Sequence, residues 1–153
     1  MTVVGFGFTR MEAERKEGAR GRLDINNNLS IRAVEKTALA LGKSNQEALR
    51  FLFSFTSVYE PDAGKITLDG EILDIEDEQT VKDVLAEWNN NKKVPQQVMA
   101  RILNTALNRC NVQALLLSRE INLPPPIPMP RVNVKGIQEN PAVTETKKAK
   151  KKK

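Results

Sequence analysis

The chain has 153 residues, 40% of them hydrophobic, which is enough for one folded domain with a core. It has no histidine and therefore lacks the commonest general base and metal ligand, and its single cysteine excludes an internal disulfide or a cysteine-based zinc site. The composition thus argues against an enzyme, predicts no cofactor and no metal, and suits a reducing cytoplasm.

The formal net charge of +5 comes from the C-terminus. Six of the last seven residues are lysines, namely Lys147, Lys148, Lys150, Lys151, Lys152 and Lys153. The rest of the chain has 18 basic and 19 acidic residues and is close to neutral. We expect a folded domain over residues 1–132 and a disordered lysine-rich tail over residues 133–153. No run of apolar residues has the length of a membrane span or of a signal-peptide core, so we expect a protein that is neither secreted nor membrane-spanning.

The first part of the chain has the period-two alternation of strands. Val4, Phe6 and Phe8 share one parity, and the strand is expected to extend towards Lys16. Residues 29–41 are a second possible strand. The three asparagines at 26–28 precede it and predict a turn or loop.

The clearest strand comes next. Its aromatic side chains share one parity, and the residues of the other parity are mostly polar. The aromatic residues are Phe51, Phe53, Phe55 and Tyr59. The Pro-Asp-Ala-Gly sequence at 61–64 predicts a turn, so residues 65–75 should return as an antiparallel strand. Gly70 in that strand predicts a bulge.

We expect the phenylalanines of the two strand regions to share one sheet face, and two interpretations of this face stay open. The face is either a core covered by helices, or in part an apolar groove for a partner, because aromatic residues dominate interfaces as well as cores.

After the strands the period changes to that of helices. Asp74 and Asp77 are N-cap candidates, and the acidic residues Asp74, Glu76, Asp77 and Glu78 indicate a helix start rather than a metal or acid–base site. Apolar residues from Val81 to Trp88 then recur at helical spacing, and the asparagines at 89–91 end this short helix.

Pro95 opens a longer helix that reaches Arg119. Its apolar stripe includes Cys110, which we interpret as an inert core residue. Its opposite side is polar and poor in charge, at Gln96, Gln97, Asn104, Thr105, Asn108 and Asn111. Such a side suits either water or a subunit interface. The elements together predict an α+β fold, with a meander-type antiparallel sheet followed by a short and a long helix.

The long helix is followed by an apolar, proline-rich stretch. Residues 124–130 contain five prolines, which fix φ and remove backbone donors, so this segment cannot be helical. It must lie against the domain or project as an apolar arm. A binding function is therefore favoured over catalysis.

The lysine tail allows different interpretations. It is either a solubilising end, or it neutralises phosphates on RNA or at an anionic membrane surface. The second possibility leads to the alternative function of a ribosome- or RNA-associated protein docked through its tail.

Two stretches resemble the SecB family of export chaperones, particularly its archaeal SecB-like members. The stretch at 65–73, Lys-Ile-Thr-Leu-Asp-Gly-Glu-Ile-Leu, looks like the last strand of that family. The stretch at 102–126 is similar to its long helix, which ends in a Leu-Asn-Leu-x-Pro type of turn, here Ile121-Asn122-Leu123-Pro124-Pro125. The resemblance covers residues 3–132.

The resemblance implies a four-stranded antiparallel sheet with helices packed on one side, assembled as a dimer of dimers. It also implies ATP-independent capture of unfolded polypeptides in long apolar grooves. Bacterial members are acidic, whereas this domain is near neutral with a cationic tail, so the translocation-motor partner and the export role do not carry over.

The leading hypothesis is thus a cytoplasmic holdase chaperone that binds non-native, extended chains. The candidate contacts are the aromatic residues and the apolar arm, namely Phe51, Phe53, Phe55, Tyr59, Trp88, Asn122, Leu123, Pro124, Ile127 and Met129.

Overall fold

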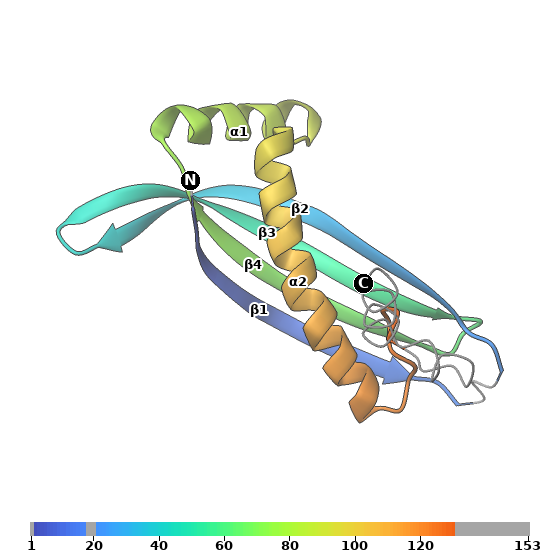
Figure 1. The fold of residues 1–153 in the computed structure, drawn as a ribbon. Helices are drawn as coiled ribbons and strands as arrows, with labels where there is room; N and C mark the ends of the chain where they lie inside the picture. The colour runs from blue at the N-terminus through green and yellow to red at the C-terminus, as the bar shows by residue number, and fades with distance from the viewer. Residues whose placement is uncertain (1, 18–20, 131–153) are drawn as a thin grey trace, which may run out of the picture.

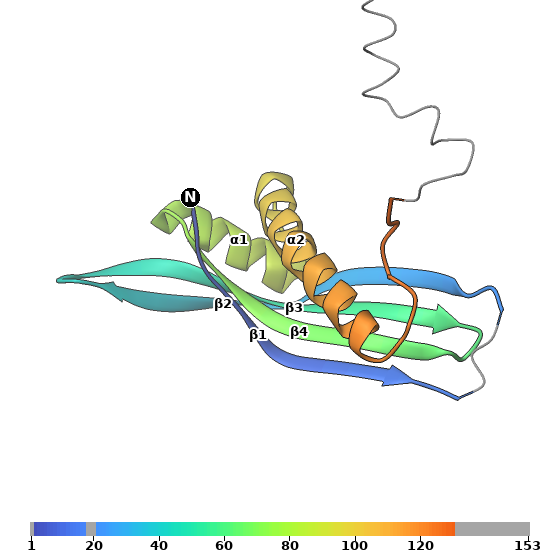
Figure 2. The ribbon, with the colours of Figure 1, turned by 60° about the horizontal axis from the view of Figure 1, so that its bottom comes forward.

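A computed structural model describes residues 2–17 and 21–130 of the chain as a sheet layer and a helix layer (Figure 1). The strands are β1 (Thr2–Arg15), β2 (Asp24–Leu41), β3 (Ser44–Glu60) and β4 (Gly64–Ile75), and the helices are α1 (Glu78–Asn91) and α2 (Gln96–Glu120). All strand pairs are antiparallel. Both helices lie on one face of the sheet (Figure 2). The predicted α+β fold is therefore confirmed.

The order of the strands in the sheet is β1-β4-β3-β2. The last three strands of the chain form a meander, and β1 adds to its far side by pairing with β4, so β1 and β2 are the edges. The pairing of β3 with β4 ends at Ala48 and Ile75, and residues 44–47 pair with β2 alone. This end of β2 and β3 forms a two-stranded hairpin that extends beyond the sheet (Figure 1).

The predicted turn at the three asparagines is wrong, because they belong to β2. Asn26 pairs with Val58 and Asn28 pairs with Thr56, in one continuous register with β3. Asparagine favours turns through local hydrogen bonds, but pairing along the full length of β3 outweighs that local preference.

The bulge predicted at Gly70 is also misplaced. The register of β4 with β3 is continuous through Gly70, and the shift occurs on β1, between Phe8 and Arg10. Glycine is required here by close packing, since an added Cβ would lie 2.6 Å from a ring carbon of Phe53 and 2.5 Å from the carbonyl oxygen of Gly7.

Helix α1 begins as predicted at one of its two candidate caps. The carboxylate of Asp77 accepts a hydrogen bond of 2.7 Å from the backbone N–H of Thr80, which satisfies one of the free amides of the first turn. This bond lowers the pKa of Asp77. The helix ends at Lys92, whose φ of 57° is left-handed. Helix α2 begins after Pro95, also as predicted.

The aromatic face of the sheet is core in this structure. Phe51, Phe55 and Tyr59 have no exposed surface, and Phe53 has almost none. Helix α2 covers this face with every fourth residue, at Val98, Ile102, Ala106, Cys110, Ala114 and Ser118. Burial raises the pKa of the Cys110 thiol to about 12, which fits the inert role expected for it.

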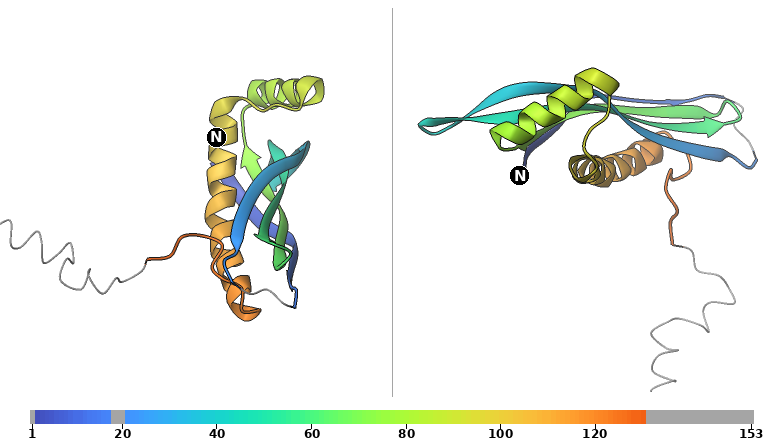
Figure 3. Two further views of the ribbon diagram at one scale, coloured as in Figure 1. Left: turned by 90° about the vertical axis from the view of Figure 1, so that its right-hand side faces the viewer. Right: turned by 90° about the horizontal axis from the view of Figure 1, so that it is seen from above.

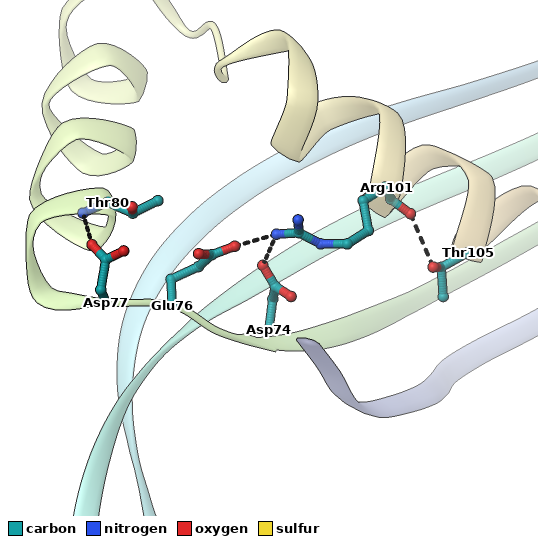
Figure 4. A network of polar contacts seen from close by, with 6 residues as sticks. All are labelled: Asp74, Glu76, Asp77, Thr80, Arg101 and Thr105. Carbon is teal, nitrogen blue, oxygen red and sulfur yellow. Dashed lines mark hydrogen bonds and ion pairs between the residues drawn. The ribbon is translucent and has the colours of Figure 1, made fainter. Parts of the chain in front are cut away.

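Asp74, the other proposed cap, belongs to a buried ion cluster instead (Figure 4). Its Oδ2 lies 2.6 Å from the Nη2 of Arg101, and the same nitrogen contacts Glu76. Both carboxylates are buried, at the end of β4, whereas Arg101 is on the second turn of α2. Burial, followed by the effect of Asp74, raises the pKa of Glu76. The cluster fixes the start of α2 over the end of the sheet.

The opposite face of the sheet has no helix over it in the described part of the chain (Figure 3). Its side chains form ion pairs across the strands, such as Arg50 with Glu35 on β2. Asp69 lies between the guanidinium groups of Arg10 and Arg32, at 3.9 and 3.7 Å. The sheet is therefore apolar towards the helices and charged on its open side.

Candidate functional site

The C-terminal end of α2 turns the chain back towards the sheet. Asn122 adopts a left-handed φ of 58°, which asparagine tolerates better than most residues, and the N–H of Leu123 donates to the carbonyl of Ser118 over 2.8 Å. Leu123 is buried in the core cluster. Residues 121–130, which we call the arm, therefore return over the helix-covered face of the sheet (Figure 2).

Three polar side chains of the sheet hold the arm. The hydroxyl of Tyr59 donates to the carbonyl of Pro124, and the side-chain amide of Asn27 donates to that of Pro126, each over 2.7 Å. The hydroxyl of Ser57 in turn donates to the Oδ1 of Asn27 over 2.6 Å. Burial raises the pKa of Tyr59 to about 12, so its hydroxyl is a neutral donor at physiological pH. Proline has no backbone N–H to donate, but its carbonyl can accept these bonds.

Sequence reasoning missed Asn27 and Ser57, although the pattern held a signal. Asn27 and Ser57 face one another across β2 and β3, on the same side as Phe55 and Tyr59. A polar residue whose neighbours on the same side of the strand are apolar needs a hydrogen-bond partner. The free carbonyls of the proline-rich segment supply one.

Two open grooves flank the arm. The first, which we call the β2 groove, lies between the arm and the beginning of β2 and has a volume of about 690 Å³. The second, the α2 groove, lies between the arm and the last turns of α2 and has a volume of about 680 Å³. Pro124, Pro125 and Met129 line both grooves. The arm is thus a shared wall with an open channel on each side.

The lining of the α2 groove is largely apolar, whereas that of the β2 groove is mixed. Leu23 and Ile25 contribute to the β2 groove, and Leu115 and Leu116 to the α2 groove. Met129 is 46% exposed and Leu116 is 50% exposed. An apolar surface of this kind favours the binding of apolar side chains, since their removal from water is the main gain in free energy.

The structure brings together only part of the candidate contacts. Asn122, Pro124 and Met129 are exposed on the arm, Ile127 is half-buried, and Leu123 is buried at the base of the α2 groove. The aromatic candidates lie in the core, at Phe51, Phe53, Phe55 and Tyr59 on β3 and at Trp88 on α1. Because they are buried, they are not accessible to a ligand in this structure. The hydroxyl of Tyr59 contacts the arm.

The lysines from 147 to 153 lie outside the described residues. Within the described part of the chain, no group of three histidine, cysteine or acidic residues could hold a metal ion. No helix among the described residues is both long and apolar enough to cross a membrane.

Comparison with known proteins shows a likeness in structure alone. No protein-family model matches the chain, and no curated protein matches it in sequence. One similar solved structure is that of the Mycobacterium tuberculosis SecB-like chaperone Rv1957 in complex with a ChAD peptide from the Rv1956 HigA1 antitoxin. It is 12% identical, covers 85% of this chain and 89% of its own, and has a TM-score of 0.50. This likeness shows a SecB-like fold.

Proposed function

We propose that the protein is an ATP-independent holdase chaperone that binds non-native, extended polypeptides along the two grooves beside the arm. The observation that supports this most directly is the arm itself, a proline-rich wall that is hydrogen-bonded to the sheet and has an open groove on each side. The solved chaperone with a similar fold is bound to a peptide, which agrees with a polypeptide ligand.

The binding would rest on apolar burial. Each Å² of apolar surface that a client removes from water contributes about 25 cal/mol before the costs of association. The three consecutive prolines at 124–126 offer carbonyls but no N–H groups, so a client cannot pair with this part of the arm as with a strand edge. Selectivity for particular side chains would therefore be loose, as a holdase requires.

This proposal is tested by suppression of aggregation of a chemically unfolded protein, without ATP. Met129→Ser removes an exposed apolar side chain from both grooves and should lower suppression severalfold; Ile127→Ser should act in the same direction. Met11→Ser is the matched control, because Met11 is 50% exposed on β1 and lies in neither groove. Absence of suppression by the wild-type chain, or an equal loss in all three variants, would contradict the proposal.

The position of the arm should matter as well as its composition. Asn27→Ala removes the hydrogen bond to Pro126 and leaves every apolar side chain of the grooves in place. We expect weaker capture of the unfolded protein, since a loosened arm must be reordered when the client binds. Unchanged capture by a folded Asn27→Ala protein would show that capture does not depend on this hydrogen bond.

A further inference from the structure

The charged residues that line the two grooves are both arginines. Arg22 lines the β2 groove and Arg119 lines the α2 groove, and no carboxylate of the described chain lines either one. Both side chains are exposed, and neither has an ion pair with another described residue. Each guanidinium is therefore available to a ligand.

The acidic residues near these arginines are directed elsewhere. Glu120 follows Arg119 on α2, but successive helical residues point about 100° apart, and Glu120 is absent from the α2 groove lining. Asp24 lies in a separate hollow at the β3–β4 turn. The other charged residues of that hollow are Glu14, Glu60, Asp62, Lys16 and Lys65. The two grooves are thus cationic at their margins, although the domain as a whole is close to neutral.

We infer that the preferred clients are extended apolar segments flanked by acidic residues, and that Arg22 and Arg119 determine this preference. The inference rests on the proposed function, because it assigns a selectivity to the same grooves. Apolar side chains of the client would lie against the arm, with Met129 between the two channels. A client carboxylate beside this contact would form charge-assisted hydrogen bonds with a guanidinium. A client lysine at the same place would meet an unpaired positive charge, which would lower its affinity.

The preference should be moderate and sensitive to salt. A single exposed ion pair changes affinity only a few-fold, so two arginines together should favour the acidic client by about three- to tenfold over a neutral one. Raising the ionic strength shortens the screening length and should remove most of this difference. The apolar part of the affinity should remain.

The test uses the full chain and a labelled apolar peptide flanked by two glutamates, two glutamines or two lysines, followed by fluorescence anisotropy. We expect the affinities to fall in that order. The double variant Arg22→Glu and Arg119→Glu should reverse the order, so that the lysine peptide binds best. Lys43→Glu, with the charge reversed in the turn between β2 and β3, should keep the wild-type order and is the matched control.

The three peptides distinguish a failure of the proposed function from a failure of the charge preference. If the glutamine peptide does not bind, the proposed function itself fails. If it binds and the glutamate peptide binds no better, the charge preference alone is wrong. Because the double variant retains the lysine tail, a preference for glutamate that survives in this variant would assign the selectivity to the tail and would overturn the role of the two arginines.

Discussion

Arg101 connects the beginning of α2 to the end of β4 through two buried carboxylates (Figure 4). Removing one partner of a buried ion cluster is costly, because the remaining charges stay desolvated and unpaired. We therefore expect Arg101→Met to lower the free energy of unfolding by about 3 kcal/mol.

Chemical denaturation at neutral pH would measure this loss. Arg119→Met is the control, because the Arg119 side chain is exposed without an ion pair among the described residues, and its replacement should change stability by less than about 0.5 kcal/mol. Equal stability of the two variants would mean that the cluster does not hold the helix. Asp74→Asn in the Arg101→Met background should recover part of the loss, since it removes a buried charge.

Cys110 gives the stability of the domain a dependence on alkaline pH. Its pKa is raised to about 12 in the folded state, whereas an unfolded thiol titrates near pH 8.5. Between these values the folded state binds more protons than the unfolded state, so stability falls as the pH rises through this window. Tyr59, whose pKa is also raised to about 12, contributes with the same sign from about pH 10 upwards.

Replacing the thiol isolates its share of this dependence. Cys110→Ala should unfold with a smaller loss of stability between about pH 8.5 and pH 11 than the wild-type chain, measured as the change in denaturation midpoint. The folded wild-type protein should also react slowly with a thiol reagent at pH 8, and quickly after denaturation. Identical pH profiles for the two proteins would show that Cys110 is more accessible than its burial indicates.

At the scale of the elements, the sheet depends on a close approach at Gly70. The ring of Phe53 and the carbonyl of Gly7 occupy the space into which a Cβ would project. Gly70→Ala should force Phe53 or strand β1 to shift, and we expect a loss of about 1–3 kcal/mol. Denaturation of the purified variant would measure it.

Gly7→Ala serves as the comparison on the neighbouring strand. An added Cβ at Gly7 has no heavy atom within 4 Å, and alanine reduces the conformational entropy of the unfolded chain. The variant should be as stable as the wild type or slightly more so. A loss at Gly7 as large as at Gly70 would assign the effect to a general intolerance of substitution in this pair of strands, and not to the contact with Phe53.

Across the whole molecule, local sequence patterns predict some parts of the fold. The alternation at Phe51, Phe53 and Phe55 predicts β3, and Asp77 and Pro95 mark the helix starts, because each depends on neighbours in the sequence. The non-helical conformation of the arm was also predictable, since prolines exclude a helix.

The remaining features depend on contacts between distant residues. Asp74 has a partner 27 positions away, and Asn27 bonds an arm residue 99 positions away. The local pattern identifies neither partner: Asp74 resembles a helix cap, and Asn27, although it stands out among apolar neighbours of the same parity, resembles part of a turn. The two grooves lie beside an arm that such long-range bonds hold against the sheet, so the sequence predicted an apolar arm but not the channels on its sides.

The surface of the domain leads to a last prediction, on assembly. Val112, on α2, is 60% exposed, and the edge strand β1 is paired only on its β4 side in the described structure. Exposed apolar residues on a helix and an open strand edge both favour association. We therefore expect a homo-oligomer, in line with the dimer of dimers that the SecB resemblance implies, and light scattering after size-exclusion chromatography would measure its mass.

Val112→Glu places a charge on the exposed apolar part of α2 and should lower the measured mass, because a buried interface would have to desolvate that charge. Ala86→Glu, at an exposed position of α1, introduces the same charge on the other helix and should leave the mass unchanged. If the wild-type chain is a monomer at micromolar concentration, the apolar surface of α2 serves a different ligand. The exposed Leu116 of the α2 groove lies one helical turn further on, so a monomer would then favour a client-binding surface that extends along α2 to Val112.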